Sequence, residues 1–180
     1  GRLREAAAVL EVASSSDVAG SVRFDVGRAL RFLDCCIALD RGDFVRVRAG
    51  LVALEPWVGP SSPLRANLEN ARGTLAALSG GLEELDRAIA ALHAMVLSPQ
   101  LVEERVVLEL RACLLRRRPA EALPTLADGS VFAGLARLHR LRALLHDGVL
   151  PPEQVLAELG APHEHVEQRV LGRSIVAEAL

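Results

Sequence analysis

Apolar residues recur along most of the chain at intervals of three and four residues, the period of an α-helix that buries one face. Phe44, Val47, Leu51 and Leu54, for example, share one face of the segment 43–55. Short runs of Gly, Pro and Ser separate such segments. The pattern predicts ten helices, over about residues 2–13, 22–40, 43–55, 64–79, 82–96, 99–117, 119–127, 131–146, 152–159 and 163–179.

The composition supports an all-α fold. Of the 180 residues, 51% are hydrophobic but only 3% are aromatic, and there is no Tyr, so Leu, Ala and Val must fill the core. Leu and Ala favour helices, whereas the residues that favour strands are scarce. No linker long enough to separate two domains interrupts the sequence, so we expect one continuous helical domain over residues 1–180. The predicted core includes Leu33, Leu51, Leu75, Ile89, Leu110, Leu141 and Leu144.

A short motif recurs at the turns between the predicted helices. It consists of Gly, any residue, Leu or Phe, and a small or apolar residue three positions later. Its copies begin at Gly1, Gly42, Gly80 and Gly148, and in a degraded copy Arg117 replaces the glycine. The steps are 41, 38, 37 and 31 residues (1 to 42, 42 to 80, 80 to 117 and 117 to 148). A period in this range is typical of stacked helical hairpins.

Small or apolar residues stand at fixed distances before these turns. Seven positions before the turn are Cys35, Gly73, Leu110 and Leu141, and four positions before it are Ala38, Ala76, Cys113 and Leu144. The hairpins resemble tetratricopeptide-type repeats, in which the first of these residues packs closely against the second helix. The resemblance implies a superhelix of about five antiparallel helix pairs, each of which buries its apolar faces against its neighbours.

The Arg-, Leu- and Ala-rich hairpins, such as residues 113–123, are similar to the sensor arm of LuxR-type ATP-dependent activators and to the activator domain of antibiotic-regulatory proteins. In those families the repeats bind an inducer or a partner, while a separate domain binds DNA. All 21 basic residues are Arg, which suggests a GC-rich bacterial genome. The resemblance implies the ligand- or protein-sensing arm of a bacterial transcription regulator. A general adaptor that grips a peptide in its concave groove is the alternative.

Charge and motif content limit the other classes of function. The net charge of −2 argues against direct nucleic-acid binding by this segment. No apolar run approaches the roughly 20 residues that span a membrane. The three cysteines, two of them adjacent, form no disulfide framework, so we expect a cytoplasmic protein in which they are small core residues. There is no phosphate-binding loop, and Ser79, Asp86 and His93 do not make a credible triad, so we expect neither an enzyme nor a cofactor.

Arginines provide the candidate binding site. Residues 101–150 hold eight Arg against six acidic residues. The candidates are Arg111, Arg116, Arg117, Arg118, Arg137 and Arg140. They either complement helix dipoles as solvated side chains or form a groove for an anion or an acidic peptide. Trp57, the single Trp, either plugs a gap between repeats or anchors a ligand.

Two further expectations concern histidines and the first helix. His139 and His146 are seven residues apart and His163 and His165 two apart, neither of which is a usual metal-ligand spacing. Residues 2–13 have the pattern of a second helix whose partner is missing, so we expect the chain to be a piece of a larger protein. The stripe of Leu3, Ala6 and Leu10 then either mediates a homodimer or association with a partner, or frays first.

Overall fold

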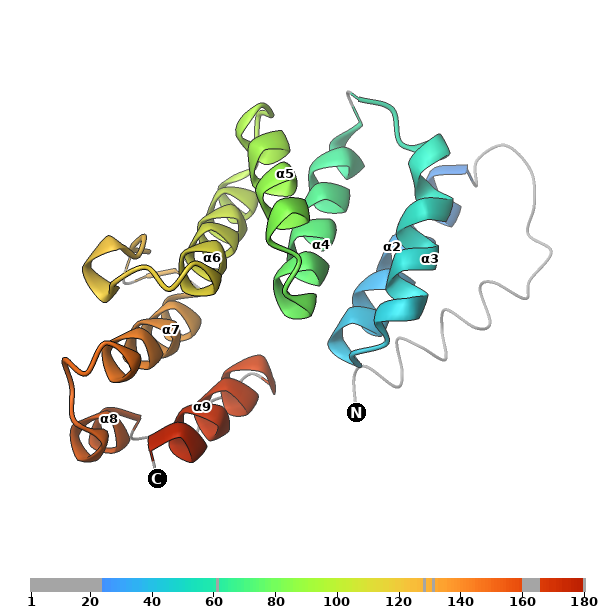
Figure 1. Cartoon of the computed structure of the whole chain (residues 1–180). Coiled ribbons are helices and arrows are strands. Elements are labelled where there is room, and N and C mark those ends of the chain that lie inside the picture. Colours follow the sequence, from blue (N-terminus) through green and yellow to red (C-terminus); the bar gives the residue numbers. More distant parts are fainter. Residues whose placement is uncertain (1–23, 61, 128, 131, 160–165, 180) are drawn as a thin grey trace.

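The computed structural model describes residues 24–60, 62–127, 129–130, 132–159 and 166–179, in which every regular element is helical (Figure 1). The all-α prediction is confirmed. The helix predicted over 2–13, and with it the predicted dimer, lies outside the described residues. The α-helices are α2 (Phe24–Asp40), α3 (Phe44–Leu54), α4 (Pro63–Ser79), α5 (Leu82–His93), α6 (Pro99–Leu115), α7 (Ala133–His146), α8 (Pro152–Leu159) and α9 (Val166–Ala179). Two 3₁₀ turns, η1 (Glu55–Trp57) and η2 (Ala120–Ala122), complete the set.

One predicted helix is absent from the described structure. The segment 119–127 forms only the single 3₁₀ turn η2, followed by extended backbone at Leu123. Pro124 explains the difference, because a proline disfavours helical backbone at the preceding residue and cannot donate a helical hydrogen bond. The helix predicted over 82–96 is also shorter, since α5 ends at His93.

The turns after four helices have the same backbone conformation. Gly42, Gly80 and Gly148 have φ angles of +73°, +76° and +67°, and Arg117, which occupies the equivalent place, has a φ of +52°. In each turn the residue that follows donates its backbone N–H to a carbonyl five positions earlier, over 2.8–3.0 Å. The four carbonyls belong to Ala38, Ala76, Cys113 and Leu144. This is the Schellman arrangement, which satisfies carbonyls at a helix end. The motif in the sequence therefore marks a real structural turn at these four places.

The first two hairpins are built on the same residue positions. Residues of the α2/α3 pair recur 38 positions later in α4/α5, as Gly42 does in Gly80. Val47 and Leu85 are equivalent in this way (85 − 47 = 38) and both are fully buried. Leu54 and Leu92 (92 − 54 = 38) are also equivalent and fully buried. Two hairpins thus use one internal packing scheme.

Apolar clusters follow one another along the array rather than forming one centre. The first joins α2, α3 and α4, the second joins α4, α5 and α6, and the third joins α6, α7, α8 and α9. Figure 1 shows the same order in space, with successive helices side by side from α2 to α9. Each hairpin therefore buries its faces against its neighbours. The superhelical geometry itself stays a prediction.

Most of the predicted core is buried. Leu51, Leu75, Leu110 and Leu141 are buried, and Ile89 and Leu144 are partly buried against the clusters. Leu33 was predicted to be in the core, and this is wrong, because its side chain is 43% exposed. In α2 the buried side includes Cys35 and Ala38. At about 100° per residue, Leu33 lies nearly opposite Cys35.

Candidate protein-interaction surface

The predicted arginine site does not form one surface. Arg116, at the end of α6, makes an ion pair with Asp86 of α5. Arg137 of α7 donates from Nη2 to the backbone oxygen and to a carboxylate oxygen of Glu158 in α8, both over 2.8 Å. These two arginines tie neighbouring helices together, which favours a structural role.

Arg111 is buried rather than solvated, since its side chain is only 8% exposed, and burial lowers its pKa to about 10. Its positive charge acts on His139 of α7, which is also buried. Burial, with the charges of Arg111 and Arg142, lowers the pKa of His139 to about 3, so the imidazole is neutral at pH 7. Neither ring nitrogen of His139 has a hydrogen-bond partner among the described residues. This pair therefore lies in the interior of the array.

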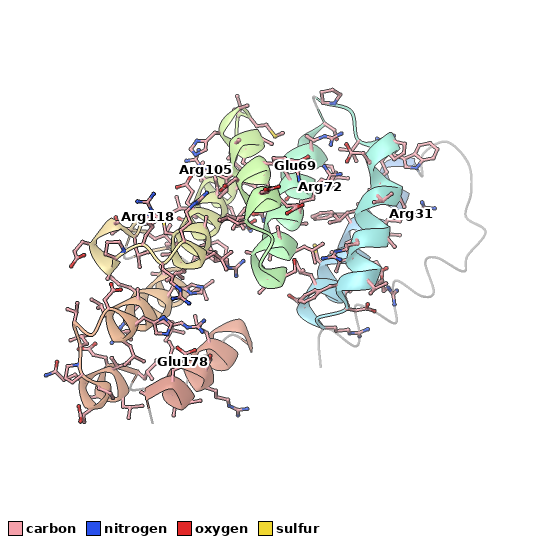
Figure 2. All side chains as sticks on the ribbon, viewed as in Figure 1. Arg31, Glu69, Arg72, Arg105, Arg118 and Glu178 are labelled. Atoms are coloured by element: carbon pink, nitrogen blue, oxygen red, sulfur yellow. The ribbon has the colours of Figure 1, made fainter. Side chains whose placement is uncertain are left out.

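Three arginines of the predicted site stay open to solvent. Arg117, Arg118 and Arg140 are exposed, and the ion pairs within the described part of the chain involve none of them. Figure 2 shows Arg118 projecting from the segment that follows α6. The interpretation as an anion-binding groove stays a prediction, and it now rests on these three residues.

Trp57 is the third residue of η1, directly after α3, and its side chain is 48% exposed. Half of the side chain is therefore buried and half is open to solvent. Both interpretations, a plug in a gap between repeats and a ligand-facing anchor, stay predictions.

An exposed apolar row that the sequence pattern alone did not single out lies along α3 and the 3₁₀ turn η1 that follows it. Val45 and Val52 are 81% and 71% exposed. Ala49 and Pro56 are also exposed, and they continue the same spacing of three to four residues. We call Val45, Ala49, Val52 and Pro56 the α3 stripe. It lies opposite Val47, Leu51 and Leu54, which pack into the core. The signal was present in the sequence, since α3 has apolar periodicity on both sides.

Charges of both signs lie around the α3 stripe. The helix contains Arg46 and Arg48 and no acidic residue. Arg46 makes a two-point ion pair with Asp34 of α2, over 3.1 and 2.7 Å. The Asp43 carboxylate caps the helix by accepting from the backbone N–H of Arg46 over 3.1 Å. The nearby acids on this side are therefore already engaged.

The acid that follows α3 is engaged as well. Glu55 accepts from Arg65 of α4 over 2.7 Å and makes a second ion pair with Arg72. Arg72 also pairs with Glu69 over 2.8 Å, and Figure 2 shows these last two side chains together on α4. The two arginines lower the pKa of Glu55, although partial burial opposes them. These ion pairs hold η1, the turn that contains Trp57, against α4.

A second polar cluster joins α4 to α6. Helix α6 begins at Pro99 and has no acid in its first turn, so Glu103 and Glu104 lie beyond that turn. The Glu104 carboxylate accepts instead from Asn70 of α4 and from Gln100, the latter over 2.8 Å. Burial raises the pKa of Glu104. The contact is a structural bridge between successive hairpins.

The cysteines are free and pack against neighbouring helices. Cys35 is buried between α2 and α3, as predicted. Burial, together with negative groups nearby, raises the pKa of Cys36 to about 11, so its thiol is protonated at neutral pH.

The described residues contain neither a candidate metal site nor a helix that could span a membrane. No three His, Cys, Asp or Glu side chains there are grouped so that they could hold a metal ion. No helix in that part of the chain is long and apolar enough to cross a membrane. His163 and His165 lie outside it.

No family model matches the sequence, and comparisons with curated proteins and with solved structures gave no match either.

Proposed function

We propose that this chain is a non-catalytic helical-repeat module that acts as the sensing arm of a bacterial transcription regulator. It would bind a protein or peptide partner, or a small-molecule inducer, in the cytoplasm. The supporting observation is that one hairpin design is used twice, 38 residues apart, with the same turn at Gly42 and Gly80. Arrays of such hairpins present extended surfaces, and these surfaces are what repeat proteins use for binding.

The engagement of polar side chains supports a role without catalysis. The Ser79 hydroxyl donates to the backbone oxygen of Leu75 over 2.8 Å, and Asp86 pairs with Arg116. His93 lies 2.9 Å from a carboxylate oxygen of Glu109 on α6. Ser79, Asp86 and His93 thus each contact a different structural partner rather than one another.

A general adaptor that assembles a complex is the second candidate. The architecture suits both functions, because the fold alone does not choose between them. The choice of a regulator rests on the resemblance of the hairpins to the repeats of bacterial activators.

The complete reading frame that contains this chain distinguishes the two. We would express it with and without residues 24–179 and measure binding to DNA from the region around its gene, together with transcription from that region. A regulator should bind DNA in both forms and lose its response to inducer without the array. A reading frame of further repeats that binds no DNA would favour the adaptor, and catalytic turnover by the chain would contradict both.

A further inference from the structure

We propose that residues 2–13 form a helix that docks on α2, over the side of α2 that carries Leu33 and Ile37. The docked helix would lie against α2 as α3 lies against α4 and as α5 lies against α6. The inference goes beyond the proposed function, because it assigns this side of α2 to the chain's own segment and so removes it from the surfaces that a partner could use.

Two interfaces between successive hairpins use the same positions of the helix that follows. In α4, Ala71 and Leu75 stand nine and five positions before the turn glycine, and both are buried in the cluster shared with α2 and α3. In α6, Leu108 and Ala112 stand nine and five positions before the turn at Arg117, and both are buried in the cluster shared with α4 and α5. The first helix of a hairpin therefore meets the preceding hairpin through these two positions.

The equivalent positions of α2 are Leu33 and Ile37, nine and five residues before Gly42. Ile37 is buried, but Leu33 is 43% exposed, whereas its equivalent 38 residues later, Ala71, is only 6% exposed. The described residues begin with Phe24 at the start of α2, so no described hairpin precedes this helix. Continuity of the array therefore calls for a helix on this side of α2.

The apolar positions of the segment 2–13 match those of α3 and α5. In both helices, the residues two, five, nine and twelve positions after the turn glycine lie in or against the clusters that join successive hairpins. They are Phe44, Val47, Leu51 and Leu54 in α3, and Leu82, Leu85, Ile89 and Leu92 in α5. Counted from Gly1, the same four positions hold Leu3, Ala6, Leu10 and Ala13. The segment thus has the apolar face with which α3 packs on α4 and α5 packs on α6.

The side chains that would meet are complementary in size. Ala6 and Ala13 are smaller than the Val and Leu at the equivalent positions of α3, while Leu33 is larger than Ala71 of α4. A smaller residue on one side and a larger one on the other conserve the packed volume, and cores tolerate such exchanges best.

The connection to α2 is long enough for this arrangement. Residues 55–62 join α3 to α4 and residues 94–98 join α5 to α6, which are connections of eight and five residues. Residues 14–23 provide ten. A helix on so short a tether has an effective concentration on the order of mM, which favours it over the same helix from a second copy of the chain.

Native-state hydrogen exchange of the full chain tests the docking. Leu33→Asp places a charge on this side of α2. Leu78→Asp is the matched control, because Leu78 is a leucine of α4 with a similar exposure of 49%. Leu10→Asp makes the reciprocal change in the segment and leaves every residue of the described helices as it is. Circular dichroism shows whether each variant keeps its helices, and light scattering gives the oligomeric state.

We expect the amides of residues 6–13 to exchange at least tenfold more slowly in the wild-type chain than in a synthetic peptide of residues 1–16. Local opening of a short docked helix, rather than global unfolding, sets their exchange. Leu33→Asp should abolish most of this protection, whereas Leu78→Asp should leave it unchanged. Leu10→Asp should speed exchange in α2 but not in α7. None of these effects should depend on protein concentration.

Unprotected amides over residues 6–13 in the wild-type chain would overturn the proposal, as would equal effects of Leu33→Asp and Leu78→Asp. Protection that is lost on dilution as a dimer dissociates would also overturn it, and would assign this side of α2 to a second copy. If Leu33→Asp does not keep its helices, Leu10→Asp decides the matter. Faster exchange in α2 of that variant supports the docking, and unchanged exchange there contradicts it.

Discussion

Gly50 of α3 approaches Cys35 of α2 so closely that a Cβ atom on Gly50 would overlap the sulfur of Cys35. In the next hairpin the equivalent positions, 38 residues later, hold Ala88 and Gly73. A Cβ atom on Gly73 would lie 3.2 Å from that of Ala88 and 2.6 Å from a methyl group of Leu108. Where the two helices of each hairpin cross, a glycine thus faces one small side chain. The glycine is on the second helix, α3, in the first hairpin and on the first helix, α4, in the next.

The crossing predicts that Gly50→Ala destabilises the protein by about 1–3 kcal/mol, because the added methyl group overpacks the contact with Cys35. Urea unfolding measures the change. Gly27→Ala in α2 is the control, since a Cβ atom there meets nothing within 4 Å, and it should stabilise by up to about 1 kcal/mol. The double variant Cys35→Gly with Gly50→Ala should recover most of the loss. Equal effects at positions 50 and 27 would mean that the two helices are not in close contact.

The left-handed backbone conformation of Arg117 predicts that a glycine there would stabilise the protein. Its φ of +52° is costly for a residue with a Cβ atom, and glycine occupies the equivalent place in the other three turns. Arg117→Gly should therefore raise the free energy of unfolding by about 1 kcal/mol, whereas Gly42→Ala should lower it by a similar amount. Thermal or urea unfolding gives both values. A destabilised Arg117→Gly would show that the arginine side chain contributes contacts that outweigh the strain.

Two leucines of the predicted core, Leu51 and Leu33, differ in burial and should differ in their contribution to stability. Leu51→Ala should cost about 2–5 kcal/mol, because the cavity between α2, α3 and α4 cannot collapse fully. Leu33→Ala should cost much less, since its side chain is 43% exposed. Urea unfolding of the two variants compares them directly. Similar losses would mean that α2 is rotated from the position described.

His139 predicts a loss of stability in mild acid. Its pKa is about 3 in the folded chain and near 6.5 when unfolded, so below pH 6.5 the unfolded chain binds a proton that the folded chain does not. The free energy of unfolding should fall by about 2 kcal/mol between pH 7 and pH 5 from this residue alone. Below about pH 4.5 the loss of ionised Glu55 and Glu178, whose pKa values are lowered, would add to it.

The variant His139→Leu isolates this contribution. Burial raises the pKa of Asp40 and Glu104, so these two carboxyl groups oppose the trend as they protonate. The difference between wild type and His139→Leu removes their effect. We expect the variant to lack the fall between pH 7 and pH 5, and an identical pH dependence in both proteins would contradict a buried neutral imidazole.

The local parts of the fold were predictable because local chemistry decides them. A glycine with positive φ ends a helix wherever it stands, so Gly42, Gly80 and Gly148 marked their turns correctly. Cys35 and Gly73 marked the close crossings for a similar reason, since only small residues fit there. The helix predicted over 119–127 does not form because Pro124 prevents it despite the helical spacing of apolar residues.

The surface was harder to predict than the turns. Helical period shows that α3 has two apolar sides, but which side is buried depends on where α2 and α4 lie. The exposure of Leu33 and the burial of Arg111 likewise depend on where the neighbouring helices lie. The arginines were close in sequence, yet Arg116 and Arg137 face acids on different neighbouring helices, which no spacing rule indicates.

In the modular array that we propose, each hairpin depends for its stability chiefly on its neighbours. Native-state hydrogen exchange of the Leu51→Ala variant tests it most directly. In a modular array, protection should fall strongly in α2 and α3, less in α4 and α5, and little in α7, α8 and α9, because coupling passes only between adjacent units. An equal loss of protection in α3 and in α9 would show instead a single cooperative core, and it would contradict the repeat architecture on which the proposed function rests.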